Sequence, residues 1–584
     1  MATERSVEKY LARFNRLKSA DQQWEPLYTL LSETFLMREV DYTNAPLPGR
    51  FILDNAFDNT GQFAAHVFAS VLLSMLWPDA ERTFNIVPAR QLRKRPGVEE
   101  YFRAVTARQQ AAMGRVEAGL VVAFMGYLLD QGIFGISGVG NFDGPDDDWD
   151  APVVYEAWDV KGMHVEENPQ GFVDTVFFEI RRSARQVADD YVKPGDRVAA
   201  VVTAKVAAGK GDEIVRVLKI IEPRPKAERE GKKGVAGMAY RTVHIDIDNK
   251  IIMRQGGYQK MPVHVGRMFK RMEETRGRSC GMTVLPDAIS LNGLSEAVLV
   301  ATEKQLDPPL GVLDDGRLGG GTIDTSAGAL NVFNAAGRIG GEKPVFPLLT
   351  VGELQSAEKQ MQRLEQKVMQ GFFLDRLLDL NNKTQMTAFE ASIRNRLRGE
   401  SLGSIFARQI MEVITPTIED TFDRMFNKGY FGDFPGVKGP GVEQRRKWKA
   451  LTGTDDMVVP DVVRRAVEAG LNIYEIEYIS PAQRFMEAEK LQGAFTAADA
   501  VAALNPIFPS MADGVDPDEY LRRIWKFTGA PIEGLRTIED LKRFRAEQAQ
   551  RQNAVVALEA ADKMADIQNK SAQARAALGT MGGK

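Results

Sequence analysis

Histidine and cysteine, which often catalyse reactions or bind metals, are few and scattered in this 584-residue chain. Its four histidines (His66, His164, His244 and His264) and its single Cys280 form no HxxxH or CxxC spacing. Metal sites and activated nucleophiles need clustered ligands or bases, so this pattern disfavours both. His66 lies in a nearly apolar run, which favours a buried core position for it. A single cysteine excludes an internal disulfide and fits a reducing cytoplasm.

Two short runs offer the remaining enzymatic interpretations. The carboxylates of Asp146–Asp148 could serve a hydrolase or a cation site, but the run lies in a Gly- and Pro-containing segment typical of a solvated loop. Gly316–Gly321 is glycine-rich, yet neither GxGxxG nor GxxxxGK[ST] occurs there. No GxSxG motif surrounds Ser279. We therefore expect no enzymatic activity, no cofactor and no metal.

The polar segment Asn381–Gln385 (NNKTQ) carries a different kind of chemistry. Its amides can donate hydrogen bonds to phosphate oxygens, and Lys383 adds one positive charge. Phosphate contacts of this kind carry no sequence information, and few cations mean weak binding of nucleic acid. The alternative is an ordinary solvent-exposed loop with an ordinary lysine.

A long helical pattern follows this loop. Thr387 and Glu390 fit a capping box, and apolar residues recur at helical spacing from Ile393 to Phe426. Pro416 should kink the helix because it removes a hydrogen-bond donor. Lys428-Gly429 predicts the end of the helix. The pattern predicts roughly 40 residues of one kinked helix, about 60 Å long at ~1.5 Å per residue.

The preceding segment, residues 286–380, is predicted to form two helices around a Gly-rich insert. Helices are expected from Pro286 to Leu306 and from Leu354 to Leu380, joined by a long loop of Gly and small residues at 313–346. On the second helix, Lys359, Arg363 and Lys367 alternate with Glu353, Glu358 and Glu365, which permits ion pairs four residues apart. Such a Gly-rich loop favours an adaptable docking surface.

The N-terminal half divides into a helical and a β-rich part. Residues 1 to about 130 show helical periodicity, and the run at 63–78 is apolar all round, which predicts burial. Short β-branched and aromatic runs then predict strands within 133–259, with Asn249 in a hairpin turn at positive φ. The expected strands are Val153–Tyr155, Val173–Ile180, Val198–Val202, Ile214–Ile221, Thr242–Ile247 and Ile251–Met253.

Composition and charge limit the classes of protein to which this chain can belong. The chain is 44% hydrophobic and 26% charged, with a formal net charge of −4, which is ordinary for a soluble globular protein. This charge gives no overall nucleic-acid signal, so DNA handling would need local patches. The N-terminus lacks the apolar core of a signal peptide, and the apolar runs are too short or interrupted to span a bilayer.

Several sequence motifs together resemble those of the portal (head-to-tail connector) proteins of short-tailed double-stranded DNA phages. The resemblance covers nearly the whole chain. It rests chiefly on the long helix and on four shorter elements: Thr387-Ala388, Glu390, Leu402-Gly403, Arg408, Glu412, Pro416, Ile418, Phe422, Gly429 and Pro435; Gly171 to Gln186; Arg276–Ser279; Asp307–Pro309; and Tyr478–Gln483. Thr275 and Cys280, on either side of Arg276–Ser279, differ from the residues typical of the family at these positions.

The resemblance implies an α+β, mainly helical portal fold. Its parts would be a wing with a β-rich portion (1–270), a stem helix (271–306), a clip (307–349), a second stem helix (350–380), a tunnel loop (381–386), a long wing helix (387–435), a crown (436–535), and a barrel helix with a disordered tail (536–584).

The resemblance also implies function. Identical subunits, expected as a dodecamer, would form a ring at one capsid vertex of the virion after synthesis in the bacterial cytoplasm. The ring would pass double-stranded DNA without sequence specificity through a constriction lined by Asn381, Asn382, Lys383, Thr384 and Gln385. Lys359, Arg363 and Lys367 would pair between subunits or face the channel.

The clip would dock the terminase first and the tail adaptor later, and the wing would contact capsid and scaffold proteins. Its expected docking residues are Asp314, Asp315, Arg317, Arg338, Glu342 and Lys343. Two alternatives stay open at this point: another phage structural protein, such as a scaffold or internal core protein, and a soluble hydrolase.

Overall fold

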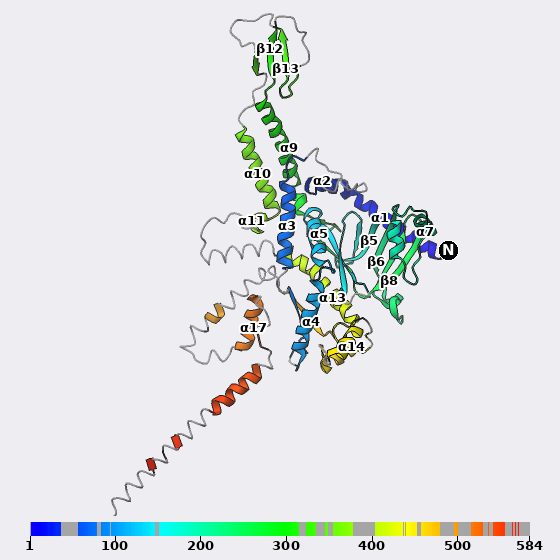
Figure 1. The fold of residues 1–584 in the computed structure, drawn as a ribbon, viewed down its shortest axis with the longest axis vertical. Helices are drawn as coiled ribbons and strands as arrows, with labels where there is room; N and C mark the ends of the chain where they lie inside the picture. The colour runs from blue at the N-terminus through cyan, green and yellow to red at the C-terminus, as the bar shows by residue number, and fades with distance from the viewer. Residues whose placement is uncertain are drawn as a thin grey trace, which may run out of the picture.

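The fold was analysed in a computed structural model. It describes residues 2–36, 56–78, 83–93, 95–145, 151–314, 323–334, 345–347, 354–377, 403, 405–435, 437, 440–452, 457–478, 496–499, 501, 516–528, 535–536, 541–554, 563–564, 567 and 570–571. The arrangement of these parts is shown in Figure 1.

The β-rich portion is built on a five-stranded antiparallel sheet covered on both faces. Its strands, in spatial order, are β4 (Met163–Glu167), β5 (Val173–Ser183), β6 (Ile214–Pro223), β7 (Tyr240–Asp246) and β8 (Ile251–Tyr258). Helix α1 (Ala2–Asp21) packs Val7 and Phe14 against Leu218 and Ile220 on one face. Helices α6 (Ala184–Asp190) and α7 (Ala200–Ala207) cover the other. The alternation of apolar residues along β6 thus serves two separate cores.

Smaller sheets connect this portion to the rest of the chain. A three-stranded sheet has the order β3 (Val153–Trp158), β2 (Ile136–Asp143), β9 (Val263–Arg267), and β10 (Phe269–Lys270) pairs with β11 (Gly277–Arg278). The mixture of helices and antiparallel sheets confirms the predicted α+β class.

Two local predictions in this region were wrong. Val198–Val202 is not a strand, because Ala199 and Val202 pack into the core beside α6, and the helix α7 begins at Ala200. In the turn between β7 and β8, positive φ falls on Lys250 (φ 54°) and not on Asn249. Asn249 instead donates hydrogen bonds from its backbone and side chain to Asp246.

The predicted helical N-terminal region contains the expected helices and one strand. The helices are α1, the 3-10 turn η1 (Gln22–Trp24), α2 (Glu25–Phe35), α3 (Thr60–Leu76), α4 (Val98–Met113) and α5 (Leu120–Phe134), interrupted by β1 (Phe84–Pro88). Burial of α3 is one-sided: Phe68 and Leu72 are buried, whereas Phe63 is 57% exposed and His66 is also exposed. The prediction of a fully buried run with His66 in the core was therefore wrong.

A helical hairpin projects from the body (Figure 1). Its arms are α9 (Cys280–Leu306) and α10 (Gln355–Gly371), and the tip carries β12 (Leu310–Asp314), β13 (Leu330–Asn334) and β14 (Val345–Pro347). Strand β13 is parallel to β12, and β14 is antiparallel to it. The Gly-rich insert therefore contains a small sheet where a loop was predicted.

The second arm ends earlier than predicted. Phe373 adopts a left-handed conformation (φ 57°) after Gly371, and a short helix α11 (Leu374–Leu377) follows. The adjacent Phe372 is fully buried, with edge contacts to Phe35 and Phe68 at ring-centroid distances of 5.6 and 5.8 Å. Burial of Phe372 in the body compensates for the break in the helix, a tertiary preference that helical periodicity cannot indicate.

The long helix is described from 405 onward. It contains a π-helical turn η3 (Ile410–Ile414), followed directly by α13 (Thr415–Asn427), with Pro416 at the second position of α13. Gly429 has φ 79°, and Tyr430 donates its backbone N–H to Met425, which closes the helix as Lys428-Gly429 predicted. The capping box at Thr387 and Glu390 lies outside the described residues.

Beyond the long helix, the described elements are mainly helical. They are α14 (Pro440–Thr452), α15 (Asp461–Glu468), strand β15 (Tyr474–Tyr478) and α17 (Pro517–Thr528). Strand β15 pairs antiparallel with β1, with Phe84 opposite Tyr478, and so joins the two halves of the chain. The helical residues at 541–554 are mostly exposed.

Candidate functional site

Two structural features bear on function: the charges of the projecting hairpin, and a polar cluster that fixes the long helix to the body. On the hairpin, Lys359, Arg363 and Lys367 are all exposed. Lys367 Nζ lies 3.2 Å from Asp287 Oδ1 on α9, with both side chains partly exposed. Lys367 thus pairs across the hairpin and not with an acid of its own helix, while Lys359 and Arg363 have no ion pair within the described residues.

Most of the other predicted site residues cannot be placed. Asn381, Asn382, Lys383, Thr384 and Gln385 lie outside the described residues. Of the predicted docking residues, Asp314 ends strand β12, where only the backbone is described. The remainder also lie outside the described residues: Asp315, Arg317, Arg338, Glu342 and Lys343.

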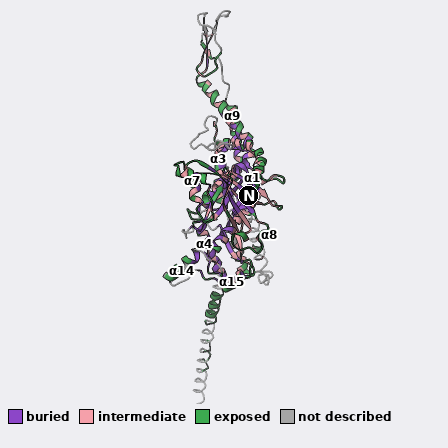
Figure 2. Cartoon of the chain, turned by 90° about the vertical axis from the view of Figure 1, so that its right-hand side faces the viewer, coloured by how far each residue is buried: buried purple, intermediate pink, exposed green. Residues whose placement is uncertain are grey.

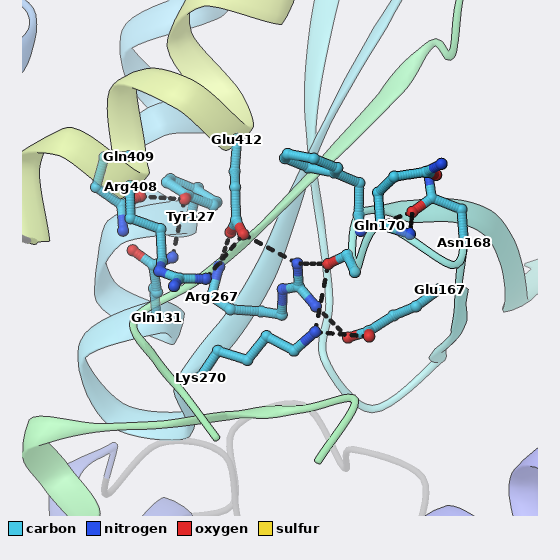
Figure 3. Close-up of polar contacts among 12 residues, drawn as sticks. Tyr127, Gln131, Glu167, Asn168, Gln170, Arg267, Lys270, Arg408, Gln409 and Glu412 are labelled. Carbon is cyan, nitrogen blue, oxygen red and sulfur yellow. Dashed lines mark hydrogen bonds and ion pairs between the residues drawn. The ribbon is translucent and has the colours of Figure 1, made fainter. Parts of the chain in front are cut away.

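A buried arginine fixes the π-helical turn of the long helix (Figure 3). Arg267, at the end of β9, is only 1% exposed. Its backbone N–H donates to Glu412 Oε2 at 2.9 Å, and its Nη2 donates to Glu412 Oε1 at 2.9 Å. This two-point contact fixes both the position and the orientation of Glu412 within η3.

The same arginine joins η3 to the five-stranded sheet. Nη2 of Arg267 donates to the carbonyl of Gly171 at 2.8 Å, and Nη1 pairs with Glu167. Lys270 Nζ lies 2.6 Å from Glu167 Oε2, which adds a second cation to this carboxylate. Gly171 has φ 83°, and the turn that it allows presents its carbonyl to both cations.

The long helix contributes three residues from two adjacent turns to this cluster. Arg408 Nη1 donates to Glu412 Oε1 at 3.0 Å, one turn along the same helix. The Tyr127 hydroxyl donates to Gln409 and accepts from Gln131 at 2.9 Å, which links the helix to α5. Burial raises the pKa of Tyr127 well above its usual value, so the hydroxyl stays protonated and able to donate.

The π-helical turn explains how the helix accommodates Pro416. A proline has no N–H to continue the helical ladder and clashes with the preceding turn. The wider turn at 410–414 lies immediately before it, so the irregularity takes the form of a π bulge. Such turns are uncommon and often mark functional positions.

A second buried pair lies about two helical turns beyond Glu412 along the same helix. Arg424 Nε donates to Asp420 Oδ2 at 2.9 Å, and its Nη1 lies 3.2 Å from Asp143 Oδ2. Burial raises the pKa of Asp420 to about 6, against the opposing influence of Arg424. The hydroxyls of Thr421 and Tyr155 lie 2.7 Å apart beside this pair. Polar contacts therefore follow α13 as well as η3.

The histidines are dispersed through the fold, each in a different environment. His164 Nδ1 lies 2.5 Å from Asp21, His244 Nδ1 lies 2.8 Å from the Tyr191 hydroxyl, and His264 Nε2 has no hydrogen-bond partner among the described residues. In this part of the chain no three His, Cys, Asp or Glu side chains are grouped to hold a metal ion.

Sequence reasoning missed the centre of the polar cluster. Arg408 and Glu412 stood out only through the resemblance, whereas Arg267, Glu167 and Gln409 were not singled out. The available signal was the pair of polar residues Gln409 and Glu412 next to the apolar stripe of the long helix. Their partners lie more than 100 residues away in the sequence, so local patterns could not identify them.

Comparison with known proteins decides the family. Residues 7–535 match the family model described as "Bacteriophage head to tail connecting protein". The chain belongs to this family. It is similar to a "Probable portal protein" of Bordetella phage BPP-1, with 24% identity over 441 residues that cover 73% of this chain and 75% of the relative. The expected resemblance to head-to-tail connectors is thus confirmed.

Solved structures give weaker likenesses. The virion of a native gene transfer agent particle contains a chain 10% identical to this one, with a TM-score of 0.28 over 72% of this chain and 92% of that chain. The neck of the native particle, computed with C12 symmetry, contains a chain that is also 10% identical, with a TM-score of 0.29 over 71% and 91%.

Proposed function

We propose that this head-to-tail connecting protein is a portal protein. Identical copies form a closed ring, a dodecamer, at one vertex of a phage capsid in the virion. The ring encloses a channel through which double-stranded DNA enters during packaging and leaves during ejection. The observation that carries this proposal is the family match, which spans residues 7–535.

The described architecture supports a division of labour within each subunit. The α9–α10 hairpin is the stem, the small sheet of β12, β13 and β14 belongs to the clip, and the β-rich body is the wing. The long helix would begin after the loop 381–386, and its described part is fixed to the wing by Arg267 and Glu412. An element fixed so firmly at one end can hold a loop at its other end in a defined place.

The loop 381–386 would form the constriction of the channel. Repetition around an axis converts Asn381, Asn382, Thr384 and Gln385 into a collar of hydrogen-bond donors and acceptors with one ring of Lys383 charges. Such a collar contacts phosphates weakly and without sequence preference, which suits a duplex that must slide.

The clip would be the docking surface for other proteins. Its charged residues Asp314, Asp315, Arg317, Arg338, Glu342 and Lys343 would bind the terminase during packaging and the tail adaptor afterwards. The wing would contact the capsid and scaffold proteins. ATP hydrolysis belongs to the terminase in this scheme, and the subunit has a structural role.

Negative-stain electron microscopy of the purified chain tests the proposal. The expected result is a population of rings with a central hole, of a mass many times the 64.8 kDa of one chain. Compact monomers or filaments at every protein concentration and ionic strength tested would contradict the proposal.

A further inference from the structure

Helix α9 is apolar but largely uncovered in the single subunit. It is the one described helix that is long and apolar enough to cross a membrane, yet only 28% of its most apolar window is buried. Its buried residues end at Ser295. Leu299 and Leu306, which continue along the helix, are 56% and 82% exposed, and Figure 2 colours stretches of α9 green, as exposed. An apolar surface of this kind indicates a binding surface.

The carboxylates of α9 lie on two opposite sides of the helix, and Lys304 in its last turn is the one cation of α9. Asp287 marks one side, because it contacts Lys367 of α10. Glu296 lies nine positions further along α9, which is about half a turn away at ~3.6 residues per turn. Glu303 follows seven positions later and therefore shares the side of Glu296. Both glutamates are exposed and have no ion pair within the described residues.

The charges of α10 are separated in the same way. Arg363 precedes Lys367 by four positions and lies on the same side of α10. Glu365 is two positions from Lys367, so it points to the other side, and Glu358 shares that side because it is seven positions from Glu365. The hairpin therefore has one basic side, with Arg363, Lys367 and the neighbouring Lys359, and one acidic side.

Exposed apolar side chains accompany the acidic side. Ile289 lies seven positions before Glu296, and Val300 lies four positions after it, so both share its side of α9. They are 47% and 43% exposed. The acidic side thus combines Glu296 and Glu303 with two apolar residues, a composition that suits a protein contact better than contact with water.

We propose that the two sides of the hairpin are the two halves of one contact between neighbouring copies of this chain. The basic side of one copy binds the acidic side of the next, with Arg363 and Lys359 facing Glu296 and Glu303, and with Ile289 and Val300 covered by the neighbour. A contact that joins two different surfaces of identical chains closes into a ring when the rotation permits. The inference rests on the proposed ring and assigns its stem interface.

Charge complementarity favours this partner over a lipid bilayer. Asp287, Glu296 and Glu303 all lie within α9, and ionised residues inside a membrane-spanning helix are costly. A second copy supplies the cations that Glu296 and Glu303 lack among the described residues. Each exposed ion pair is weak because water and salt screen it, so the interface depends on repetition of the contact around the ring.

Disulfide cross-linking tests the contact. The variant Glu296→Cys is mixed with the variant Arg363→Cys and oxidised. The native Cys280 does not interfere, because it is buried and burial raises its pKa well above the usual value. We expect covalent dimers from the mixture, and a ladder of higher oligomers from the chain that carries both substitutions. Glu296→Cys mixed with Lys232→Cys, an exposed position in a separate segment, is the matched control and should not cross-link.

Charge reversal gives an independent readout. Lys359→Glu with Arg363→Glu should reduce the fraction of rings at least several-fold at moderate salt, and adding Glu296→Lys with Glu303→Lys should restore it. Rings that form without the cross-link and resist charge reversal would overturn this interface while leaving the ring intact. Failure to form any rings would overturn the proposed function itself. Flotation of the chain with phospholipid vesicles would overturn the inference in favour of a bilayer.

Discussion

Arg267 and Glu412 form a buried ion pair in which both charges are almost inaccessible to water. The side chains are 1% and 4% exposed, and Arg267 also binds Glu167 and the carbonyl of Gly171. Burying charges is costly, so the cluster stabilises the fold only while every partner is present. Its position at the π-helical turn makes it a determinant of how the long helix is oriented.

Removing Glu412 should therefore destabilise the body strongly. Glu412→Ala leaves Arg267 and Arg408 without a shared acceptor, and we expect a loss of about 3 kcal/mol in the free energy of unfolding, measured by denaturant titration. Glu419→Ala is the matched control, because the pair of Glu419 with Lys260 is 42% and 39% exposed, and its cost should stay within ~1 kcal/mol. Equal costs for the two variants would show that the cluster has no special role.

The buried histidines predict a loss of stability in acid. Burial, with the nearby Arg424 and Lys260, lowers the pKa of His264 to about 3, and burial with Lys219 and Arg254 lowers that of His244 to about 3. The unfolded chain binds these protons near pH 6.5, so stability is full above that pH and is lost as the pH falls from about 6.5 towards 3. Asp420, whose pKa is raised to about 6, opposes this trend between about pH 4 and 6.

His264→Gln tests that assignment. Removing one proton-binding group should lower the slope of stability against pH by up to ~1.4 kcal/mol per pH unit between about pH 6 and 4, measured by thermal or denaturant unfolding. His66→Gln is the control, since His66 is exposed. An unchanged slope for His264→Gln would contradict the neutral, buried state of this histidine.

Lys383 is the residue on which the proposed DNA contact depends most. Lys383→Glu replaces one ring of positive charge with negative charge at the constriction, so we expect reduced packaging or retention of DNA in assembled particles. Lys383→Gln should be milder, because it keeps a hydrogen-bond donor. Normal DNA content in Lys383→Glu particles with normal ring assembly would contradict a contact between Lys383 and DNA.

Among the elements, those with strong local signals were predicted well. The end of the long helix at Gly429 and most strands of the five-stranded sheet follow from periodicity and turn residues. Strand β1 was missed, because its five residues gain their structure from β15, nearly 400 positions away. The early end of α10 and the π-helical turn were missed for the same reason: burial of Phe372 and the contacts of Glu412 come from distant segments.

Helix termination offers a sharp test at this scale. Gly429 and Gly470 end two helices in the same left-handed conformation, with φ 79° and 66°. A Cβ atom added at Gly429 would lie 2.4 Å from the Val442 side chain. A Cβ atom added at Gly470 would have no neighbouring atom of the described residues within 4 Å. Gly470→Ala should cost about 1–2 kcal/mol of conformational strain, and Gly429→Ala should cost ~1–3 kcal/mol more through the clash. Equal losses in thermal unfolding would contradict the tight packing of Gly429.

At the scale of the whole molecule, the candidate site was predictable only in part. The order of the hairpin and the long helix could be inferred from the sequence because each element has its own pattern, and the loop 381–386 between them stays a prediction. The two-sided charge of the hairpin needed the contact between Lys367 and Asp287, which fixes how α9 and α10 face each other. A ring is a property of many chains, and a single sequence indicates it only through the family to which it belongs.

In the proposed ring, many copies surround one axis and bring residues 381–386 together there. A three-dimensional electron microscopy reconstruction of the assembled ring tests it most directly. We expect these residues to line the narrowest part of the central channel, with α9 of each subunit against α10 of its neighbour. A ring in which residues 381–386 lie on the outer rim would contradict the account.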